Sequence, residues 1–149
     1  MKPLMAVALS GGIDSLIAAK LLMIEGHPVI GIHFLTGYES PDNPSPEHLA
    51  ELLSSRIGID VYLMDAAQDF KETVVDYFVG AYLSGLTPNP CMVCNSRIKF
   101  GPLLEYAKSL GAGFLATGHY ARISADSSGV CRLFRALMRP RTSPIFCPG

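Results

Sequence analysis

The stretch that decides the fold is AVALSGGIDSLIAAKLL, residues 6–22. It begins with an apolar run typical of a buried strand, turns at Ser10-Gly11-Gly12, and continues as a helix from about Asp14. Glycine lets a backbone approach an anion closely, and the N–H groups at the start of a helix favour phosphate. The stretch therefore predicts a strand, a phosphate-binding turn and a helix.

Asp14 is an unusual residue for a phosphate-binding turn, because its negative charge repels phosphate unless a cation lies between them. Hard oxygen ligands suit Mg²⁺, so we expect Asp14 to act with Mg²⁺ bound to a pyrophosphate group. The hydroxyls of Ser10 and Ser15 are expected to donate to phosphate. The turn has no lysine and is not a Walker A motif. The alternative is a plain glycine-rich turn between a strand and a helix.

Short apolar runs alternate with longer amphipathic ones along the chain, which is typical of stacked βα units. We expect strands at residues 4–9, 29–34, 59–64 and 114–117, and a loop at 85–95. Helices are expected at residues 14–25, from Pro46 with Ser45 as N-cap, from a capping box at 69–72 through 81, and at 102–110. The fold class predicted is α/β, a doubly wound parallel sheet with its ligand site at the carboxyl ends of the strands.

Composition and charge argue against several classes of protein. Of the 149 residues, 49% are hydrophobic and 17% charged, which predicts a globular fold rather than disorder. The net charge of −1 gives no global basic field that would attract nucleic acid. No apolar run approaches the roughly 18 residues of a membrane span, and the start does not resemble a secretory signal. We therefore expect a cytoplasmic protein without a membrane partner.

Residues 87–95, TPNPCMVCN, carry two thiols, Cys91 and Cys94. Without a secretory signal such a pair indicates redox, metal or catalytic chemistry rather than a structural disulfide. A cation such as Arg97 or Lys99 is expected to lower the pKa of a thiol and make it a better nucleophile. Two structural cysteines, a zinc site and an iron–sulfur cluster completed by a further cysteine are the alternatives.

Two motifs resemble known families. SGGxDS at residues 10–15 resembles the PP-loop of N-type ATP pyrophosphatases (adenine nucleotide alpha hydrolase-like), which cut ATP between its α- and β-phosphates. Residues 85–123, with TPNPxxxCN, IKFG and ATGHYA, closely resemble tRNA-specific 2-thiouridylases, which put sulfur on carbon 2 of the wobble uridine. The likeness extends nearly to Leu137, so residues 1–137 are identified as an incomplete PP-loop domain of this family.

The resemblance implies roles for individual residues. Cys94 matches the active-site cysteine, and members usually have Asp at the position of Cys91. With Asp14, these two are the predicted catalytic residues. The predicted tRNA contacts are Asn89, Pro90 and Cys91. The predicted nucleotide contacts are Ala8, Leu9, Ser10, Gly11, Gly12, Ile13, Asp14, Ser15, Phe34 and Gly118. His119 joins them because it follows a predicted strand, where α/β sheets bind ligands.

The implied reaction uses ATP and Mg²⁺ to adenylate the C2 oxygen of uridine in tRNA. A persulfide sulfur, supplied by a sulfur-donor protein, then displaces AMP. The family scheme uses a second cysteine in a later segment, which this chain does not reach, so we expect ATP binding or hydrolysis without complete thiolation. The other functions that remain open are a PP-loop enzyme acting on a small molecule and an iron–sulfur or ATP-binding module without thiolation activity.

The tail, residues 138–149, breaks the pattern with MRPRTSPIFCPG. Restoring one base in a permitted back-translation changes it to a peptide beginning LDAAQDQSHFL, which resembles the LDxxKDQSYFL segment of the family. We therefore predict that residues 138–149 are an aberrant tail produced by a one-base deletion, in the gene or in its reading. Arg139, Arg141 and Cys147 would then have no evolved role.

Overall fold

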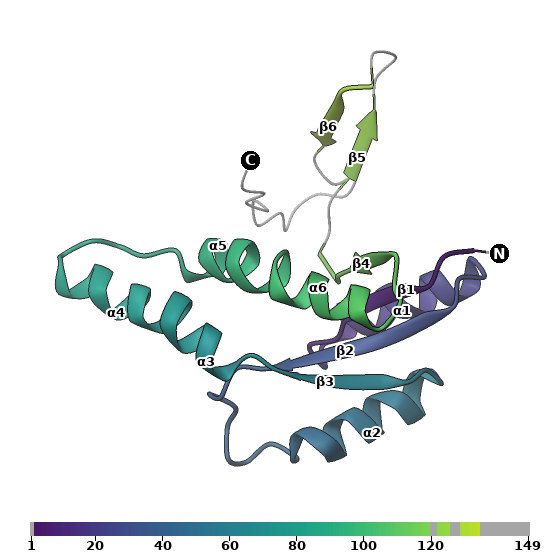
Figure 1. Cartoon of the computed structure of the whole chain (residues 1–149), viewed down its shortest axis with the longest axis horizontal. Helices are drawn as coiled ribbons and strands as arrows, with labels where there is room; N and C mark the ends of the chain where they lie inside the picture. Colours follow the sequence, from purple (N-terminus) through teal and green to yellow (C-terminus); the bar gives the residue numbers. More distant parts are fainter. Residues whose placement is uncertain (1, 120–121, 126–128, 135–149) are drawn as a thin grey trace. The chain divides into compact units, whose positions relative to one another are not determined.

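The computed structural model describes residues 2–119, 122–125 and 129–134 (Figure 1). A parallel sheet has the strand order β3-β2-β1-β4. Its strands are β1 (Met5–Ala8), β2 (Val29–Leu35), β3 (Val61–Asp65) and β4 (Phe114–Ala116). The chain winds outward from β1 to β2 and β3, and then returns to place β4 on the other side of β1. The predicted doubly wound sheet is confirmed; the predicted tail at 138–149 lies outside the described residues.

Helices cover both faces of this sheet. They are α1 (Ile13–Ile24), α2 (Pro46–Ile57), α3 (Ala67–Phe70), the π-helix η1 (Lys71–Val75), α4 (Asp76–Leu83), α5 (Pro90–Cys94), the π-helix η2 (Asn95–Lys99) and α6 (Pro102–Ser109). Successive side chains of a strand point to opposite faces. Accordingly, Val7 of β1 packs in one cluster with α1 and α2, and Ala6 in another with α6. The result is a three-layer arrangement, helices–sheet–helices (Figure 1).

Local signals in the sequence predict several helix ends correctly. The hydroxyl of Ser45 accepts a hydrogen bond from the amide of His48, and Pro46 opens α2, as expected of an N-cap followed by proline. Gly26 and Gly111 follow α1 and α6 with φ of 81° and 85°, a region that favours glycine. These helix ends depend on nearby residues only, which is why the sequence reveals them.

Three local predictions are wrong. The capping box at residues 69–72 does not exist, because the helix already begins at Ala67, whose amide donates to the Asp65 side chain. β3 begins at Val61, two residues later than expected. The loop predicted at residues 85–95 ends at Asn89, and the CxxC segment is helical. In this last case Asn89 and Pro90 provide an N-cap and a first helical residue that the sequence prediction did not use.

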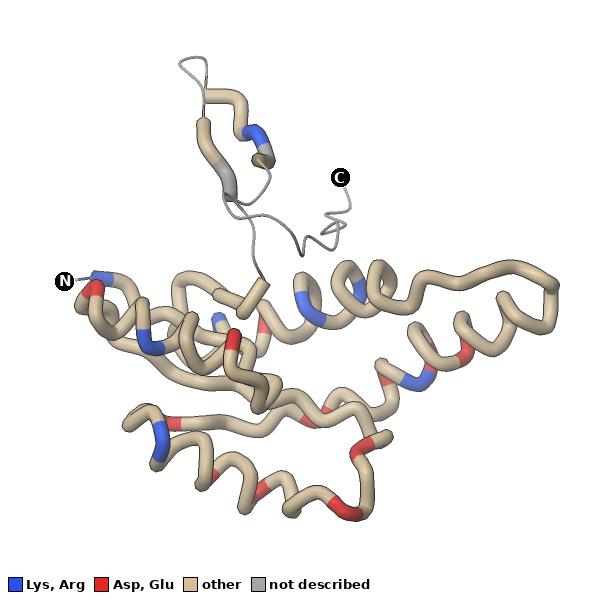
Figure 2. The backbone as a smooth tube through the Cα atoms, turned by 180° about the vertical axis from the view of Figure 1, so that it is seen from behind, with Lys and Arg blue, Asp and Glu red and all other residues tan. Residues whose placement is uncertain are grey.

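The structure divides into two compact units, Met1–Gly118 and His119–Gly149. In the second unit β5 (Arg122–Ala125) and β6 (Cys131–Phe134) form an antiparallel pair. Lysine and arginine are dispersed among acidic residues along the described backbone, with no continuous basic stripe (Figure 2). Within the described ranges, no helix has the length and apolar character needed to cross a membrane.

Candidate nucleotide and thiol site

The order of the strands creates a switch point at the carboxyl ends of β1 and β4. The chain leaves β1 through α1, which covers one face, and reaches β4 from α6, which covers the other. Such a switch point opens a crevice between the two connections, and α/β sheets bind ligands there. The segment after β1 is Ser10–Gly12, and the residues after β4 are Thr117 and Gly118. Two motifs that are a hundred residues apart in the sequence therefore meet at the carboxyl edge of the sheet.

Hydrogen bonds within the loop hold its shape. The Ser15 hydroxyl donates to the Gly12 carbonyl at 2.8 Å and accepts from the Ser10 amide at 3.3 Å. The Gly12 amide donates to the Ser10 hydroxyl at 3.4 Å. Ser15 is only 3% exposed, so its hydroxyl fixes the loop rather than facing solvent. Gly11 has φ of 81°, which is strained for any residue with a Cβ.

Gly118 packs directly against the start of α1. A Cβ placed on Gly118 would lie 2.7 Å from the amide nitrogen of Ser15 and 2.8 Å from the carbonyl carbon of Asp14. Both atoms belong to the backbone and cannot move aside as a flexible side chain would. Glycine is therefore required here, because only a residue without a Cβ lets the segment after β4 pack against the start of α1. This contact brings two predicted nucleotide residues, Gly118 and Asp14, together.

The amino terminus of α1 is suited to an anion. Its N-cap is Gly12, and no side chain caps the helix. Uncapped amides and the helix dipole favour a phosphate at this place. Asp14 is exposed in the first turn. Mg²⁺ is often held by one or two carboxylates together with substrate phosphates, so one exposed carboxylate beside a phosphate site fits that ion.

The side chains of three other predicted nucleotide residues have different surroundings. Ile13 is 70% exposed at the start of α1, whereas the Leu9 side chain is buried in the core and leaves only backbone atoms for a ligand. The Leu9 carbonyl accepts from Nδ1 of His33 at 2.7 Å. Phe34 packs partly into the core near the carboxyl end of β2. His33 was not predicted; its partner is 24 residues away, so no local pattern marks it.

The two thiols lie on one short helix. α5 begins at Pro90, and the Asn89 side chain caps it by accepting from the Met92 amide at 3.3 Å. Cys91 is exposed and Cys94 is half-buried, and both are free thiols. Residues three apart on a helix lie on the same side of it. The CxxC motif thus presents two neighbouring sulfur atoms with different exposure.

Cys94 is connected to the carboxyl edge of the sheet by packing. It lies against a buried cluster formed by Ala66, Val74 and Ile98. Phe34 packs against the same cluster. Ala66 directly follows β3, and Phe34 is near the end of β2. The thiol therefore lies at the same edge of the sheet as the glycine loop.

The pKa of the Cys94 thiol is raised above its ordinary value. Burial is the main cause, because it disfavours the thiolate; the charge of Lys99 lowers the pKa, and a thiolate on Cys91 raises it. A π-turn brings residues five apart together, which explains how Lys99 reaches Cys94. The prediction that a nearby cation lowers this pKa is confirmed for Lys99, but burial outweighs that charge and the net shift is upward.

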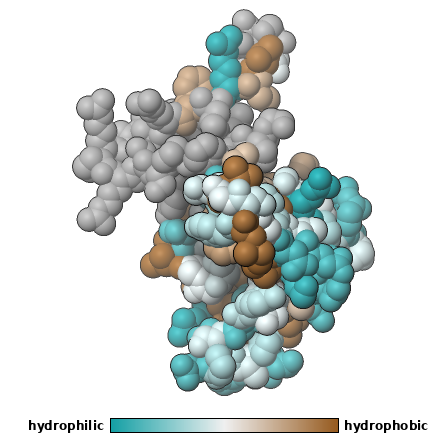
Figure 3. Space-filling view, turned by 90° about the vertical axis from the view of Figure 1, so that its left-hand side faces the viewer, coloured by the Kyte–Doolittle hydropathy of each residue, from teal (hydrophilic) through white to brown (hydrophobic). Residues whose placement is uncertain are grey.

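Tyr77 of α4 supports the predicted tRNA-contact loop. Its hydroxyl accepts from the Asn89 amide at 3.3 Å, a contact across 12 residues that no motif reveals. Exposed apolar side chains continue from here toward the end of the α4–α5 hairpin (Figure 3). They are Phe78, Val79, Tyr82, Leu83 and Leu86. In the chain, Asn89 and Pro90 thus come directly after a segment with many exposed apolar side chains.

The described residues do not form the ligand set of an iron–sulfur cluster. Such clusters are held by four ligands, usually cysteines. Cys91 and Cys94 supply two, and the described ranges contain no group of three or more His, Cys, Asp or Glu placed to hold a metal. Cys131 belongs to the second unit. A cluster on the CxxC motif would need ligands in addition to these two cysteines.

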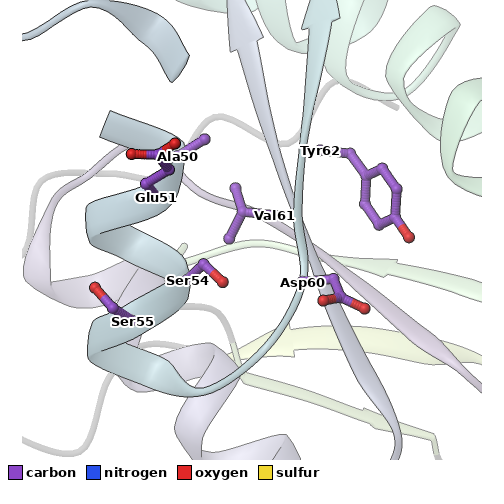
Figure 4. A pocket seen from close by; sticks show the side chains of 7 residues that line it. All are labelled: Ala50, Glu51, Ser54, Ser55, Asp60, Val61 and Tyr62. Atoms are coloured by element: carbon purple, nitrogen blue, oxygen red, sulfur yellow. The ribbon is translucent and has the colours of Figure 1, made fainter. Parts of the chain in front are cut away.

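The pocket between α2 and β3 is separate from this site. It has a volume of about 610 Å³ and is lined by Ala50, Glu51, Ser54, Ser55, Asp60, Val61 and Tyr62 (Figure 4). Asp60 and Val61 are at the amino end of β3, and parallel strands place all amino ends at the edge opposite to their carboxyl ends. None of the predicted site residues lines it.

Comparison with known proteins identifies the family. A family profile described as "tRNA methyl transferase HUP domain" matches residues 4–146. The chain is 56% identical over 128 residues to a tRNA-specific 2-thiouridylase MnmA of Desulfosudis oleivorans, covering 86% of this chain and 35% of that protein. The chain belongs to the tRNA-specific 2-thiouridylase family. This confirms the resemblance seen in the two sequence motifs.

Further comparisons show what share of its relatives' length the chain covers. A 2-thiouridylase MnmA of Trichlorobacter lovleyi is 41% identical over 142 residues, covering 95% of this chain and 40% of that protein. The chain therefore spans well under half the length of these curated relatives. A solved NMN synthetase from Francisella tularensis matches with a TM-score of 0.45 and 21% identity, covering 74% of this chain and 43% of that structure. That likeness is too distant to carry an argument.

The predicted site residues fall into two groups. Ala8 to Ser15, Phe34 and Gly118 lie in β1, the loop after it, α1, β2 and the end of β4, while Asn89, Pro90, Cys91 and Cys94 lie on or beside α5. All belong to the first unit. His119 belongs to the second unit, and its contact with a nucleotide stays a prediction.

Proposed function

We propose that this chain is the nucleotide-binding and sulfur-carrying part of a tRNA 2-thiouridylase. The observation that carries the proposal is the common location of the glycine loop, Gly118 and the half-buried Cys94 at the carboxyl edge of one parallel sheet. Family membership supports tRNA as substrate. The description of the family profile mentions methyl transfer, but the relatives are named 2-thiouridylases. A CxxC thiol at the same edge of the sheet as the glycine loop favours sulfur transfer.

The proposed first step is adenylation of the C2 oxygen of the wobble uridine. ATP would place its phosphates against the amides at the start of α1, where Gly11 and Gly12 leave room for close approach. Mg²⁺, when bound with ATP, would neutralise charge on the phosphates, and Asp14 would hold it there. The oxygen of uridine then displaces pyrophosphate and takes the AMP group. Asp14 would then bind the metal ion, although its negative charge alone would repel the phosphates.

The proposed second step uses Cys94 as the carrier of sulfur. A donor protein transfers a sulfane sulfur to this thiol, and the resulting persulfide lies beside the activated uridine. Asn89 and Pro90 at the start of α5 would contact the base, held in part by Tyr77. The described residues offer no continuous basic stripe for the tRNA backbone, so most phosphate contacts would come from other parts of the protein.

ATP–pyrophosphate exchange tests the first step. With Mg²⁺, ATP and a tRNA that has an unmodified wobble uridine, we expect exchange, and little without tRNA. Asp14→Asn should reduce it by about tenfold to a hundredfold, since metal stabilisation of phosphate charge is worth several kcal/mol. Asp60→Asn, at the opposite edge of the sheet, is the matched control. Equal exchange by Asp14→Asn, or tRNA-independent exchange with a small substrate, would contradict the proposal.

Sulfur transfer is tested separately from nucleotide use. Cys94→Ser should retain ATP binding and exchange but lose all capture of persulfide sulfur from a donor. Cys131→Ser, an exposed cysteine in the second unit, should behave like the parent. Sulfur capture by the Cys94→Ser chain would show that another residue carries the sulfur.

A further inference from the structure

Two histidines, one just before β2 and one within it, make the same kind of contact at opposite edges of the sheet. Nδ1 of His27 lies 3.2 Å from the Pro3 carbonyl, which precedes β1. Nδ1 of His33 lies 2.7 Å from the carbonyl of Leu9, which follows β1. A carbonyl oxygen only accepts, so Nδ1 is the donor in each ring. Of the two contacts, the one made by His33 is at the residue where the glycine loop begins.

His33 binds the peptide unit that opens this loop. The carbonyl of Leu9 and the amide of Ser10 belong to one planar unit. The carbonyl accepts from His33 at 2.7 Å, and the amide donates to the Ser15 hydroxyl at 3.3 Å. The Leu9 amide, one unit earlier, donates to the Ile32 carbonyl at 2.8 Å. The peptide unit between Leu9 and Ser10 is therefore held on one side by β2 and on the other by α1.

The orientation of this unit matters for the amides that follow it. Ser10 is followed directly by Gly11 and Gly12, and glycine restricts the backbone least. Leu9 is only 1% exposed, so removal of the imidazole would leave its carbonyl without a partner and without access to water. Rotation of the unit toward another donor would move the loop amides, which are the groups that favour phosphate at the uncapped start of α1.

We propose that His33 is a positioning residue of the phosphate loop, which sets the peptide unit between Leu9 and Ser10 and thereby the amides offered to the phosphates of ATP. The inference rests on the proposed function, in which this loop binds ATP. His33 acts through the backbone and not by contact with the nucleotide. Its neighbour Phe34 packs on the face of the sheet that α6 covers, and successive side chains alternate, so His33 lies on the face of α1.

The position of the donor nitrogen provides matched variants. Asn carries its amide nitrogen on Cγ, as His carries Nδ1, so His33→Asn keeps the donor in place. In His33→Gln the nitrogen is one carbon further out, and His33→Leu has none. With Mg²⁺ and the full chain, the Kd for ATP should rise by about five- to thirtyfold in His33→Leu and His33→Gln, and stay within about twofold of the parent in His33→Asn.

Adenosine separates the phosphate loop from the rest of the nucleotide site. It has no phosphate, so its Kd should be the same for the parent and for every His33 variant. Equal weakening of ATP and adenosine in His33→Leu would show that the side chain supports the sheet or Phe34 instead, and would overturn the proposal. Normal ATP binding by His33→Leu, or a failure of His33→Asn to restore it, would do the same.

His27→Leu is the control for stability, because it removes the same type of hydrogen bond at the amino edge of the sheet. Urea unfolding and circular dichroism establish that each variant is folded, and His27→Leu should bind ATP like the parent. Equal losses of ATP affinity in His27→Leu and His33→Leu would overturn the inference. If the parent chain binds no ATP, the proposed function fails and this inference with it. If the parent binds ATP and the His33 variants bind it equally well, only this inference fails.

Discussion

The glycine loop and the CxxC helix lie at the same edge of the sheet but are held there in different ways. Backbone constraints shape the loop: a left-handed Gly11, hydrogen bonds among Ser10, Gly12 and Ser15, and the close approach of Gly118. Packing holds the thiol segment, where Cys94 lies against an apolar cluster from distant parts of the chain. The loop thus holds its amides in place for a phosphate, while packing keeps the Cys94 thiol partly buried.

Gly118→Ala tests the loop most severely. The new methyl group would collide with the backbone of α1, and overpacking of this kind costs about 1–3 kcal/mol. If the strain falls on the loop, the Kd for ATP should rise by about 5- to 150-fold in equilibrium binding. Gly80→Ala in α4, where a methyl group meets open space, is the control and should bind ATP normally. Normal ATP binding by Gly118→Ala would mean that the two motifs need not touch.

Gly11→Ala should have the next largest effect. A Cβ at φ of 81° costs about 1–2 kcal/mol, although nothing lies near enough to clash with it. We expect a loss of that size in the free energy of unfolding, measured with urea, or an ATP affinity reduced by an equivalent amount where the loop changes shape. Gly12→Ala is the matched comparison, because Gly12 has an ordinary φ of −77°. Equal effects at both positions would argue against backbone strain as the cause.

Lys99→Met should have the smallest effect and concerns the thiol side. Burial raises the pKa of Cys94 and Lys99 partly offsets this, so removal of the charge should raise the pKa further. At a fixed pH below that pKa, less thiolate is present, and alkylation of Cys94 by iodoacetamide should slow by a few-fold, since such a pair is worth about 1 kcal/mol or less. In the parent chain the rate should rise with pH through a range above that of an ordinary thiol.

Lys99→Arg keeps the charge and should leave the alkylation rate near that of the parent. Lys108→Met removes an exposed lysine of α6 that pairs with Glu105, and should leave the rate unchanged. A faster reaction in Lys99→Met would show that the cation does not lower the pKa of Cys94. The peptide that contains both cysteines must be resolved by mass, so that alkylation of exposed Cys91 is counted separately.

The sequence predicts most of the nucleotide region because its signals are local. A glycine pair between an apolar run and a helix specifies a strand, a turn and a helix whatever lies elsewhere in the chain. The alternation of elements then predicts the parallel sheet. The roles of Asp14 and His119 toward a ligand stay predictions, because they concern a bound molecule rather than the fold.

The sequence by itself determined the family, the sheet and the loop after β1, since each depends on short-range pattern or motif. Only the tertiary structure decided that Gly118 lies against Asp14 and Ser15, that Tyr77 and His33 support the two motifs, and that the CxxC segment is helical with one thiol half-buried. Burial comes from residues far apart in the chain, such as Ala66, Val74 and Ile98. A charge nearby in the sequence predicted a lowered pKa for Cys94, and the desolvation that raises it exists only after folding.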